Sequence, residues 1–354
     1  MPKDSTIRYY YLGLFLLLFL SYIVGRVLEN YYLSDLSNFF VWVGSYWLAI
    51  MVYLLLAAII LDIIRLLNSF TGIIPSSFYI NYEKTKLITL LTVIFLTTVV
   101  VIAGRINALN PRDHRLSINI PKKSAEYNTL KISMASDIHL GTLIGNSRLD
   151  SLVERMNSFS PDLILLPGDM VDEDLKPVIK ENIGETLRKL NAKLGVFAVT
   201  GNHEYIGGVE EASRYLSDHG VNMLRDTVVK INSSFYLVGR EDRSKSQFGR
   251  GKRKPLEILV NGLDKNLPII MMDHQPFGLE EAVNNGIDLQ LSGHTHHGQL
   301  WPFNYITNMV YELSWGYKKK ENTHFYVSSG FGSWGPPIRL GNRPEIIYLT
   351  LHFE

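Results

Sequence analysis

The chain has 354 residues, with 35 Lys and Arg residues against 34 Asp and Glu residues, and it contains no Cys. A formal net charge of +1 gives no overall basic field, which argues against nucleic acid as a partner. Without Cys there are no disulfides, thiolate nucleophiles or Cys-based zinc sites, so a metal would have to be held by His, Asp, Glu or Asn.

Long apolar segments fill the first 104 residues. We predict membrane spans at about residues 9–28, 39–61 and 87–104, because a helix needs about 20 apolar residues to cross a bilayer core. Three buried helices of a soluble protein are the alternative, but uncharged runs this long are rare in soluble folds. A cleaved signal peptide would explain the first segment only, and no small-residue cleavage site follows it.

The basic residues around these segments favour one orientation. They lie before the first span and between the second and third, at Lys3, Arg8, Arg65, Lys84 and Lys86. The positive-inside rule then places the N-terminus in the cytoplasm and the C-terminal part outside it. Arginines within residues 105–115 follow the third span and keep the opposite topology open.

The remainder divides into a polar connector, residues 105–129, and a domain over residues 130–354. The connector contains a strand-like stretch at 115–120. In the domain, short apolar runs that end in polar residues or Gly alternate with helix-like stretches such as 147–158 and 209–219. This alternation predicts an α/β fold with a site at the carboxyl edge of its sheet.

Side chains able to bind metal follow these apolar runs. They are Asp137, His139, Asp169, Asn202, His203, His274, His294 and His296. One His after a strand is usually structural, but this many ligand types at successive strand ends predict a metal site. If residues 294–296 are extended, His294 and His296 share a face and each can take a different metal, while His297 points elsewhere. His297 could reach solvent, contact substrate or fill space, and we favour solvent.

The blocks "DIH", "GDMVD", "GNHE", "DHQP" and "GHTH", in this order, resemble the calcineurin-like metallophosphoesterase superfamily. The likeness covers about residues 130–354 and is strongest to the membrane-associated bacterial branch, in which the last block reads like "GHTHGGQ" and the end like "PIR…PE". It implies a four-layer α/β/β/α metallophosphatase sandwich, preceded here by an all-α transmembrane region of three helices.

The resemblance also implies two divalent cations and a set of ligands. Asp137, His139 and His296 would bind the first metal, Asn202, His274 and His294 the second, and Asp169 would bridge them. A carboxylate can span two cations about 3.5–4 Å apart, as two-metal phosphoester sites require. Ligands without sulfur favour Mn²⁺, with Zn²⁺ or Fe as alternatives.

The family pattern further assigns His203 as general acid and Asp172 as the carboxylate that keeps it protonated. A helix N-cap is the alternative role for Asp172. The cations would polarise the phosphoryl oxygens and lower the pKa of a bound water, which then attacks in line as hydroxide. Glu173 stands where the protein phosphatases of the superfamily carry Arg, which weakens a protein phosphatase assignment.

Two features bear on the substrate. Residues 240–254 are rich in Lys and Arg and are either a mobile solvated loop or a basic lid for an anionic group. Aromatic residues flank the ligand blocks, at Phe277, Trp301, Phe303, Tyr305, Phe331 and Trp334. Since tethering raises the effective concentration of lipid-borne phosphoesters, we predict hydrolysis of a phosphodiester or pyrophosphate bond in a lipid or lipid-linked headgroup, at a bacterial cell membrane. A non-catalytic metal-binding scaffold or sensor is the alternative.

Overall fold

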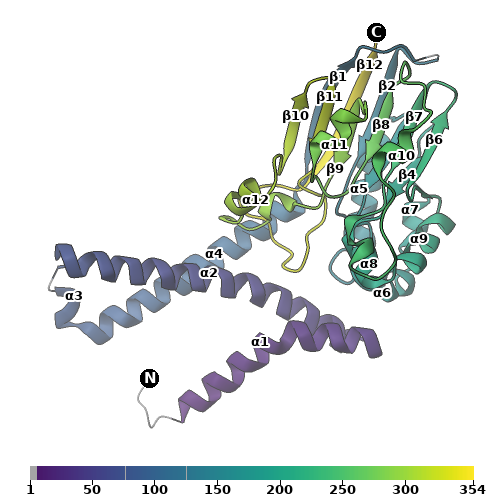
Figure 1. Cartoon of the computed structure of the whole chain (residues 1–354). Helices are drawn as coiled ribbons and strands as arrows, with labels where there is room; N and C mark the ends of the chain where they lie inside the picture. The colour runs from purple at the N-terminus through teal and green to yellow at the C-terminus, as the bar shows by residue number, and fades with distance from the viewer. Residues whose placement is uncertain (1–5, 76, 125) are drawn as a thin grey trace. The chain divides into compact units, whose positions relative to one another are not determined.

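The computed structural model describes residues 6–75, 77–124 and 126–354. The chain divides into a helical unit, residues 1–106 with 335–338, and a globular unit, residues 107–334 with 339–354 (Figure 1).

The helical unit contains the three candidate spans. These are α1 (Ile7–Tyr31), α2 (Asp35–Thr71) and α4 (Tyr82–Leu109), with the short α3 (Ser77–Ile80) before α4. Their most apolar windows have mean hydropathies of 2.0, 2.6 and 2.6, so three helices are long and apolar enough to cross a membrane. α2 begins with a capping box between Ser34 and Ser37 and ends at Gly72, whose φ of 62° closes the last turn.

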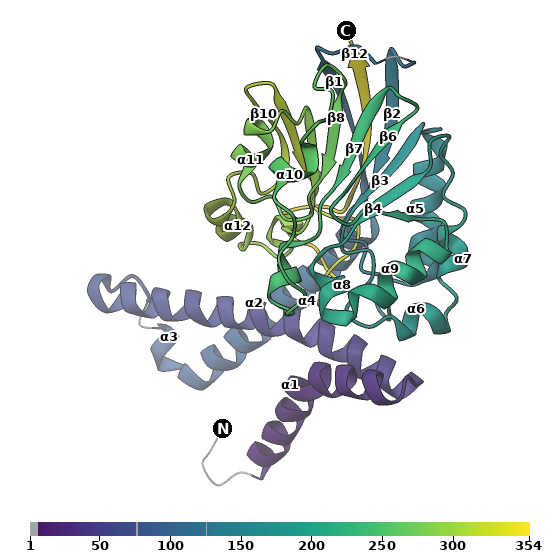
Figure 2. The same ribbon diagram turned by 45° about the vertical axis from the view of Figure 1, so that its right-hand side comes forward.

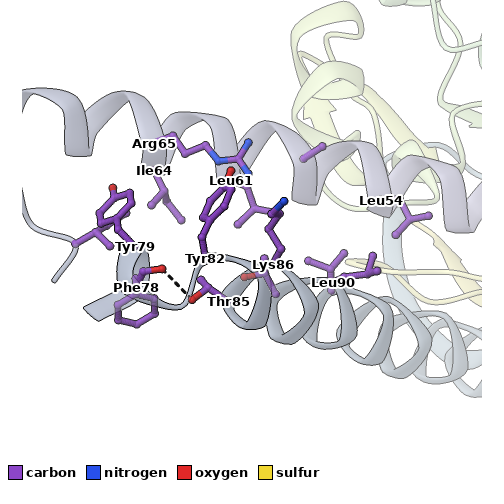
Figure 3. A pocket seen from close by; sticks show the side chains of 14 residues that line it. Leu54, Leu61, Ile64, Arg65, Phe78, Tyr79, Tyr82, Thr85, Lys86 and Leu90 are labelled. Atoms are coloured by element: carbon purple, nitrogen blue, oxygen red, sulfur yellow. Dashed lines mark hydrogen bonds between the residues drawn. The ribbon is translucent and has the colours of Figure 1, made fainter. Parts of the chain in front are cut away.

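A groove of about 460 Å³ lies between the second half of α2 and the segment from α3 into α4. Figure 3 shows its apolar wall, with Leu54 and Leu90, and its polar end, with Arg65, Tyr82 and Lys86. No His, Asp or Glu is among the described residues that line this groove, so it offers no metal ligands.

Two six-stranded sheets form the centre of the globular unit (Figure 2). The first has the order β1 (Arg112–Ile120), β12 (Glu345–Phe353), β2 (Thr129–Met134), β3 (Leu163–Pro167), β4 (Val196–Val199) and β5 (Asn222–Met223). The second has the order β10 (Gly316–Lys320), β11 (Thr323–Val327), β9 (Leu289–Ser292), β8 (Ile269–Met272), β7 (Phe235–Gly239) and β6 (Thr227–Ile231). Strands β2 to β5 are parallel to one another, as are β7, β8, β9 and β11.

The sheets pack face to face, because alternate residues of each strand point to opposite faces. Leu165 of β3 belongs to a buried cluster shared with Ile270 of β8. Its neighbour Ile164 joins a second cluster, under the helices of the first sheet. These helices are α5 (Asn146–Ser158), α6 (Lys176–Lys180), α7 (Gly184–Leu187) and α9 (Val209–Asp218). Between α7 and α9 in the chain lies α8 (Asn202–Gly207).

A third cluster joins the outer face of the second sheet to α10 (Leu256–Val260) and α11 (Leu279–Asn284). A last helix, α12 (Asn304–Val310), has no buried residue. The layers are therefore helix, sheet, sheet, helix, and the predicted α/β/β/α sandwich preceded by three apolar helices is confirmed. The strand-like residues 115–120 lie in β1, and the helix-like stretches 147–158 and 209–219 coincide with α5 and α9 to within one residue.

Candidate metal centre

The candidate ligands lie in the loops that follow parallel strands, at one edge of each sheet. Asp137 follows β2, Asp169 follows β3, Asn202 follows β4, His274 follows β8, and His294 and His296 follow β9. Most of these residues have a left-handed backbone: φ is 51° at Asp137, 54° at His139, 52° at Asp169, 71° at His294 and 45° at His296. Such conformations cost about 1–3 kcal/mol each and persist where surrounding contacts fix them.

Asp137, His139 and His296 form one buried cluster, with their ligand atoms within 4.8 Å of one another. Nε2 of His139 lies 3.0 Å from Nε2 of His296, and the latter atom lies 3.6 Å from Oδ1 of Asp137. Oδ2 of Asp137 is buried and has no hydrogen-bond partner among the described residues. A buried carboxylate oxygen without a donor is expected where a cation completes the site.

Asp169, His274 and His294 form a second cluster, to which Asn202 belongs. Oδ2 of Asp169 lies 3.0 Å from Nε2 of His274. Oδ1 of Asn202 lies 2.8 Å from Nδ1 of His294 and 3.3 Å from Nε2 of His274. Carboxylate, amide and imidazole groups thus converge, without sulfur, on one point.

Asp169 stands between the clusters. The same Oδ2 that approaches His274 lies 3.9 Å from Nε2 of His139, which belongs to the first cluster. Its Oδ1 accepts a hydrogen bond from the backbone N–H of His203 at 2.9 Å. One oxygen atom of Asp169 therefore faces both clusters.

The protonation of the site is compatible with cation binding. Nδ1–H of His274 donates to the carbonyl of Pro167 at 2.8 Å, which leaves Nε2 directed at Asp169. Burial, together with the nearby His274, lowers the pKa of His294 to about 3, so this imidazole is neutral. Burial would raise the pKa of Asp169, but the positive charge of His274 outweighs it and holds this pKa well below its usual value. Neutral imidazoles and ionised carboxylates are the forms that bind metal. His294 and Asp169 are in these forms. Burial would lower the pKa of His274, but nearby carboxylates outweigh it and raise this pKa, and burial raises the pKa of Asp137, so these two groups would release protons when a cation binds. With that release, the residues present fit a pair of divalent cations.

His203 and Asp172 lie beside the first cluster. Nδ1 of His203 is 3.3 Å from Oδ1 of Asp172, and that oxygen is also 3.7 Å from Nδ1 of His139. Burial lowers the pKa of His203, but the carboxylate of Asp172 and the charge of Asp169 outweigh burial and raise this pKa to about 9.

Residues 294–296 are not extended, so the predicted extended arrangement of this segment is wrong. Residues 296–298 form a short 3₁₀ turn in which His296 and His297 both have φ of 45°. The Asn342 amide holds this turn by donating to the carbonyls of His296 and His297, each at 3.1 Å. The two candidate ligands reach their clusters through this bend and not through strand alternation.

The expectation that His297 faces solvent is also wrong. The ring is half-buried, lies 5.4 Å from the Trp315 ring, and has Nδ1 3.1 Å from the hydroxyl of Ser314. The contacts of His297 therefore lie within the fold.

The basic segment 240–254 is neither a fully solvated loop nor a lid over the site. Arg240 is buried and pairs with Glu281 at 2.8 Å, and Arg253 pairs with Asp273 at 2.9 Å. None of its residues lines the pocket beside the clusters. Its central residues 246–252 are exposed, but its buried cations are already neutralised by carboxylates.

Three supporting residues had no predicted role. Glu204, buried in α8, accepts from the backbone N–H groups of Asp169, Val171 and Gly201 at 3.2, 2.9 and 2.7 Å. Arg339 is fully buried, and its Nη2 lies 2.9 Å from Nδ1 of His296. The third is Asn342, described above. Glu204 could have been found from the capping-box spacing after Gly201, whereas nothing local marks the role of Arg339.

A pocket of about 340 Å³ opens on the clusters. Its lining combines Asp169, Asn202, His203, His294 and His296 with Thr295, Gly298, Gln299 and Trp334. The Gln299 amide pairs with the backbone of Trp334, donating to its carbonyl at 2.9 Å and accepting from its N–H at 3.0 Å. This pairing holds a half-exposed indole at the edge of the pocket, 6.2 Å from the His203 ring.

Comparison with known proteins gives a consistent set of matches. Residues 130–298 match the family model described as calcineurin-like phosphoesterase. An uncharacterized metallophosphoesterase of Aquifex aeolicus is 34% identical over 225 residues, which are 63% of this chain and 85% of that protein. A transmembrane protein with metallophosphoesterase domain from Bos taurus is 32% identical over 288 residues, 77% of this chain and 64% of that protein.

This chain therefore spans just under two thirds of the length of the bovine relative. Among solved structures, the NAD nucleotidase of Haemophilus influenzae aligns with a TM-score of 0.38 and 16% sequence identity, over 57% of this chain and 45% of that one.

Proposed function

Since this chain belongs to the calcineurin-like metallophosphoesterase family of phosphoric ester hydrolases, we propose that it hydrolyses a phosphodiester or pyrophosphate bond in a lipid or lipid-linked headgroup. One observation carries the proposal. Oδ2 of Asp169 faces two clusters of metal-binding groups, and the His203–Asp172 pair lies beside them in the same pocket.

The proposed ligands follow the clusters. One cation would be held by Asp137, His139 and His296, the other by Asn202, His274 and His294, with Asp169 shared between them. Divalent cations bound there would polarise the phosphoryl oxygens and make a water more acidic. The nitrogen and oxygen ligands support Mn²⁺ as the resident ion, with Zn²⁺ or Fe as alternatives.

We assign His203 as the group that protonates the leaving oxygen. Asp172 faces Nδ1 of this ring, which leaves Nε2 for a group in the pocket that His203 lines. The raised pKa keeps the ring protonated near neutral pH. The hydrogen bond from its backbone N–H to Oδ1 of Asp169 keeps this proton donor next to the proposed bridging carboxylate.

The lipid-linked substrate is supported by the rim of the pocket and by the spans. Trp334 offers a half-exposed apolar surface beside His203, and the candidate spans would keep the chain at a membrane. A free anionic substrate is less well supported, because the basic segment 240–254 contributes nothing to the pocket lining.

Hydrolysis can be tested with the full chain in detergent micelles and bis-p-nitrophenyl phosphate. Mn²⁺ should stimulate turnover and EDTA should suppress it. His203→Ala should abolish turnover without changing metal content. In the control His352→Ala, at a half-buried histidine that contacts Ser117, turnover and metal content should both equal those of the wild type. If turnover is unchanged in His203→Ala, His203 is not the group that protonates the leaving oxygen.

The lipid-linked substrate needs a separate experiment. Deletion of the gene should cause one phospholipid or lipid-linked phosphoester to accumulate, and the purified chain should then hydrolyse that compound. An unchanged lipid profile, with a soluble phosphoester accumulating instead, would contradict this part of the proposal.

We propose a multi-pass location in a bacterial cell membrane, with the globular unit outside the cytoplasm. The Cys-free chain allows a direct test with single cysteines. A membrane-impermeant maleimide should label Ile258→Cys in intact cells but not Asn81→Cys, which lies between α3 and α4. The reverse labelling would establish the opposite topology.

A further inference from the structure

Exposed apolar side chains of the globular unit occur on α12, in the segments before and after it in the chain, and at the pocket edge. On this helix, Tyr305 is 60% exposed, Ile306 50%, Met309 78% and Val310 55%. Trp301 before the helix, Trp315 and Tyr317 after it, and Trp334 at the pocket edge are each between 42% and 51% exposed. We define the apolar rim as these residues together: Trp301, Tyr305, Ile306, Met309, Val310, Trp315, Tyr317 and Trp334.

The apolar rim is built onto the loop that carries the candidate ligands. Thr295, between His294 and His296, donates from its hydroxyl to the carbonyl of Ser314 at 2.5 Å, and the Ser314 hydroxyl in turn bonds to Asn308 of α12. The Gln299 amide fixes the backbone of Trp334 from the same loop. α12 and Trp334 are therefore both hydrogen-bonded to the loop that lines the pocket.

The composition of the rim is typical of one kind of partner. Soluble proteins seldom expose so many large apolar side chains together without a use for them, and α12 itself, "NYITNMV", carries no charge. Trp and Tyr side chains with adjacent aliphatic residues are typical of surfaces that lie in the headgroup region of a bilayer. At its border, Glu312 is paired with Lys318 and Lys320, at 2.8 and 3.0 Å, so it leaves no uncompensated negative charge.

The chain enters the globular unit beside the residues that support the His296 loop. Residues 107–109, which end α4, belong to this unit, and the Asn107 amide donates to the carbonyls of Arg339 and Asn342 at 2.9 and 2.6 Å. These two residues support the His296 loop from their side chains. The last residues of α4 thus belong to the globular unit and contact the residues that support the His296 loop.

We infer that the apolar rim inserts into the lipid headgroup region, so that the pocket opens at the membrane surface. This inference rests on the proposed membrane location and adds to it the surface by which a lipid-linked phosphoester would reach the pocket. A second copy of the chain is the competing occupant.

Depth measurements on nitroxide-labelled single cysteines test the inference, because the chain has no Cys of its own. Full-length Met309→Cys and the matched control Ile258→Cys, 64% exposed on α10, would be placed in nanodiscs of phosphatidylcholine and phosphatidylglycerol. The label at 309 should lose accessibility to a water-soluble nickel chelate and gain accessibility to oxygen, whereas the label at 258 should remain accessible to nickel.

Equal nickel accessibility at both positions would overturn the inference. Dipolar coupling between labels at 309 of two copies would also overturn it and assign the rim to self-association. Neither readout depends on catalysis, so hydrolysis of bis-p-nitrophenyl phosphate by the same labelled proteins reports separately on the proposed function.

Discussion

The guanidinium of Arg339 lies with Nη2 2.9 Å from Nδ1 of His296, and a guanidinium can only donate. Nδ1 is therefore the acceptor, which fixes the orientation of the ring and leaves its proton on Nε2, the atom that faces His139. A cation at Nε2 would require this proton to leave that atom. The other N–H groups of Arg339 donate to the carbonyls of Ser329 and Gly332 and to the side chain of Asn342. This buried side chain thus connects the closing segment of the chain to the candidate metal centre.

Replacing Arg339 with Lys should destabilise the protein and weaken the site. Lys has fewer donors and no planar fork, so some of these buried acceptors would lose their partners. We expect a loss of about 2–4 kcal/mol in the free energy of unfolding and weaker metal retention, measured by thermal unfolding and metal analysis. Arg214→Lys, at an exposed position of α9, should change neither. Wild-type stability and metal content in Arg339→Lys would show that the contact is dispensable.

Replacing Asp172 with Asn should shift the pH profile of hydrolysis. Because the Asp172 carboxylate raises the pKa of His203, its loss lowers that pKa. A proton donor is active below its pKa, so the alkaline limb of kcat should move to lower pH. The same profile for Asp174→Asn should match the wild type. If the alkaline limb of Asp172→Asn does not move, Asp172 does not set the pKa of the proton donor.

Replacing the two candidate aspartates should have different effects on metal content. Asp169 faces both clusters, so Asp169→Asn should reduce the occupancy of both cation positions. Asp137→Asn should affect mainly the position formed with His139 and His296. Metal analysis of the purified full chain separates these outcomes, with Asp150→Asn as the exposed control. Equal losses in the two variants would contradict the shared role of Asp169.

Metal removal should lower thermal stability. A ligand that binds only the folded state stabilises it by about 2.7 kcal/mol at a concentration about 100 times Kd. EDTA treatment should therefore lower Tm, and restored Mn²⁺ should recover it. A Tm that does not respond to either treatment would argue against cations at Asp137 and Asp169.

Replacing Glu204 with Gln should cost stability and activity together. The carboxylate accepts from three backbone N–H groups around the bridging loop, and a Gln amide can offer only one oxygen to them. We expect a loss of about 1–3 kcal/mol and lower turnover at saturating Mn²⁺. Glu211→Gln, in the exposed first turn of α9, should behave as the wild type.

The fold could be predicted from the sequence because its signals are local. Each apolar run and the polar residues after it report on one strand and its carboxyl end, and parallel strands bring those ends to one edge. Three apolar segments of sufficient length, of which only the first contains a charged residue, Arg26, likewise identify the helices that can span a membrane. The same logic predicts that Asp137, Asp169 and His274 lie near one another, because each follows a parallel strand.

What could not be predicted depends on residues far apart in the chain. The bend at residues 294–298 needs Asn342, which lies more than forty positions later, and the alternation of a strand could not reveal it. Arg240 and Arg253 form ion pairs with Glu281 and Asp273, which lie outside the basic segment 240–254. The sequence of that segment therefore could not show that these charges are already paired. The contacts of His297 with Ser314 and Trp315 are set by the chain around α12 in the same way.

The single oxygen of Asp169 that faces both clusters has a consequence for how ions would load. The first ion to bind would fix the orientation of that carboxylate for the second ion. It would also compete with the second ion for the electrons of the same oxygen atom. Loading would then be cooperative or anticooperative, and a binding isotherm would depart from the sum of two independent sites.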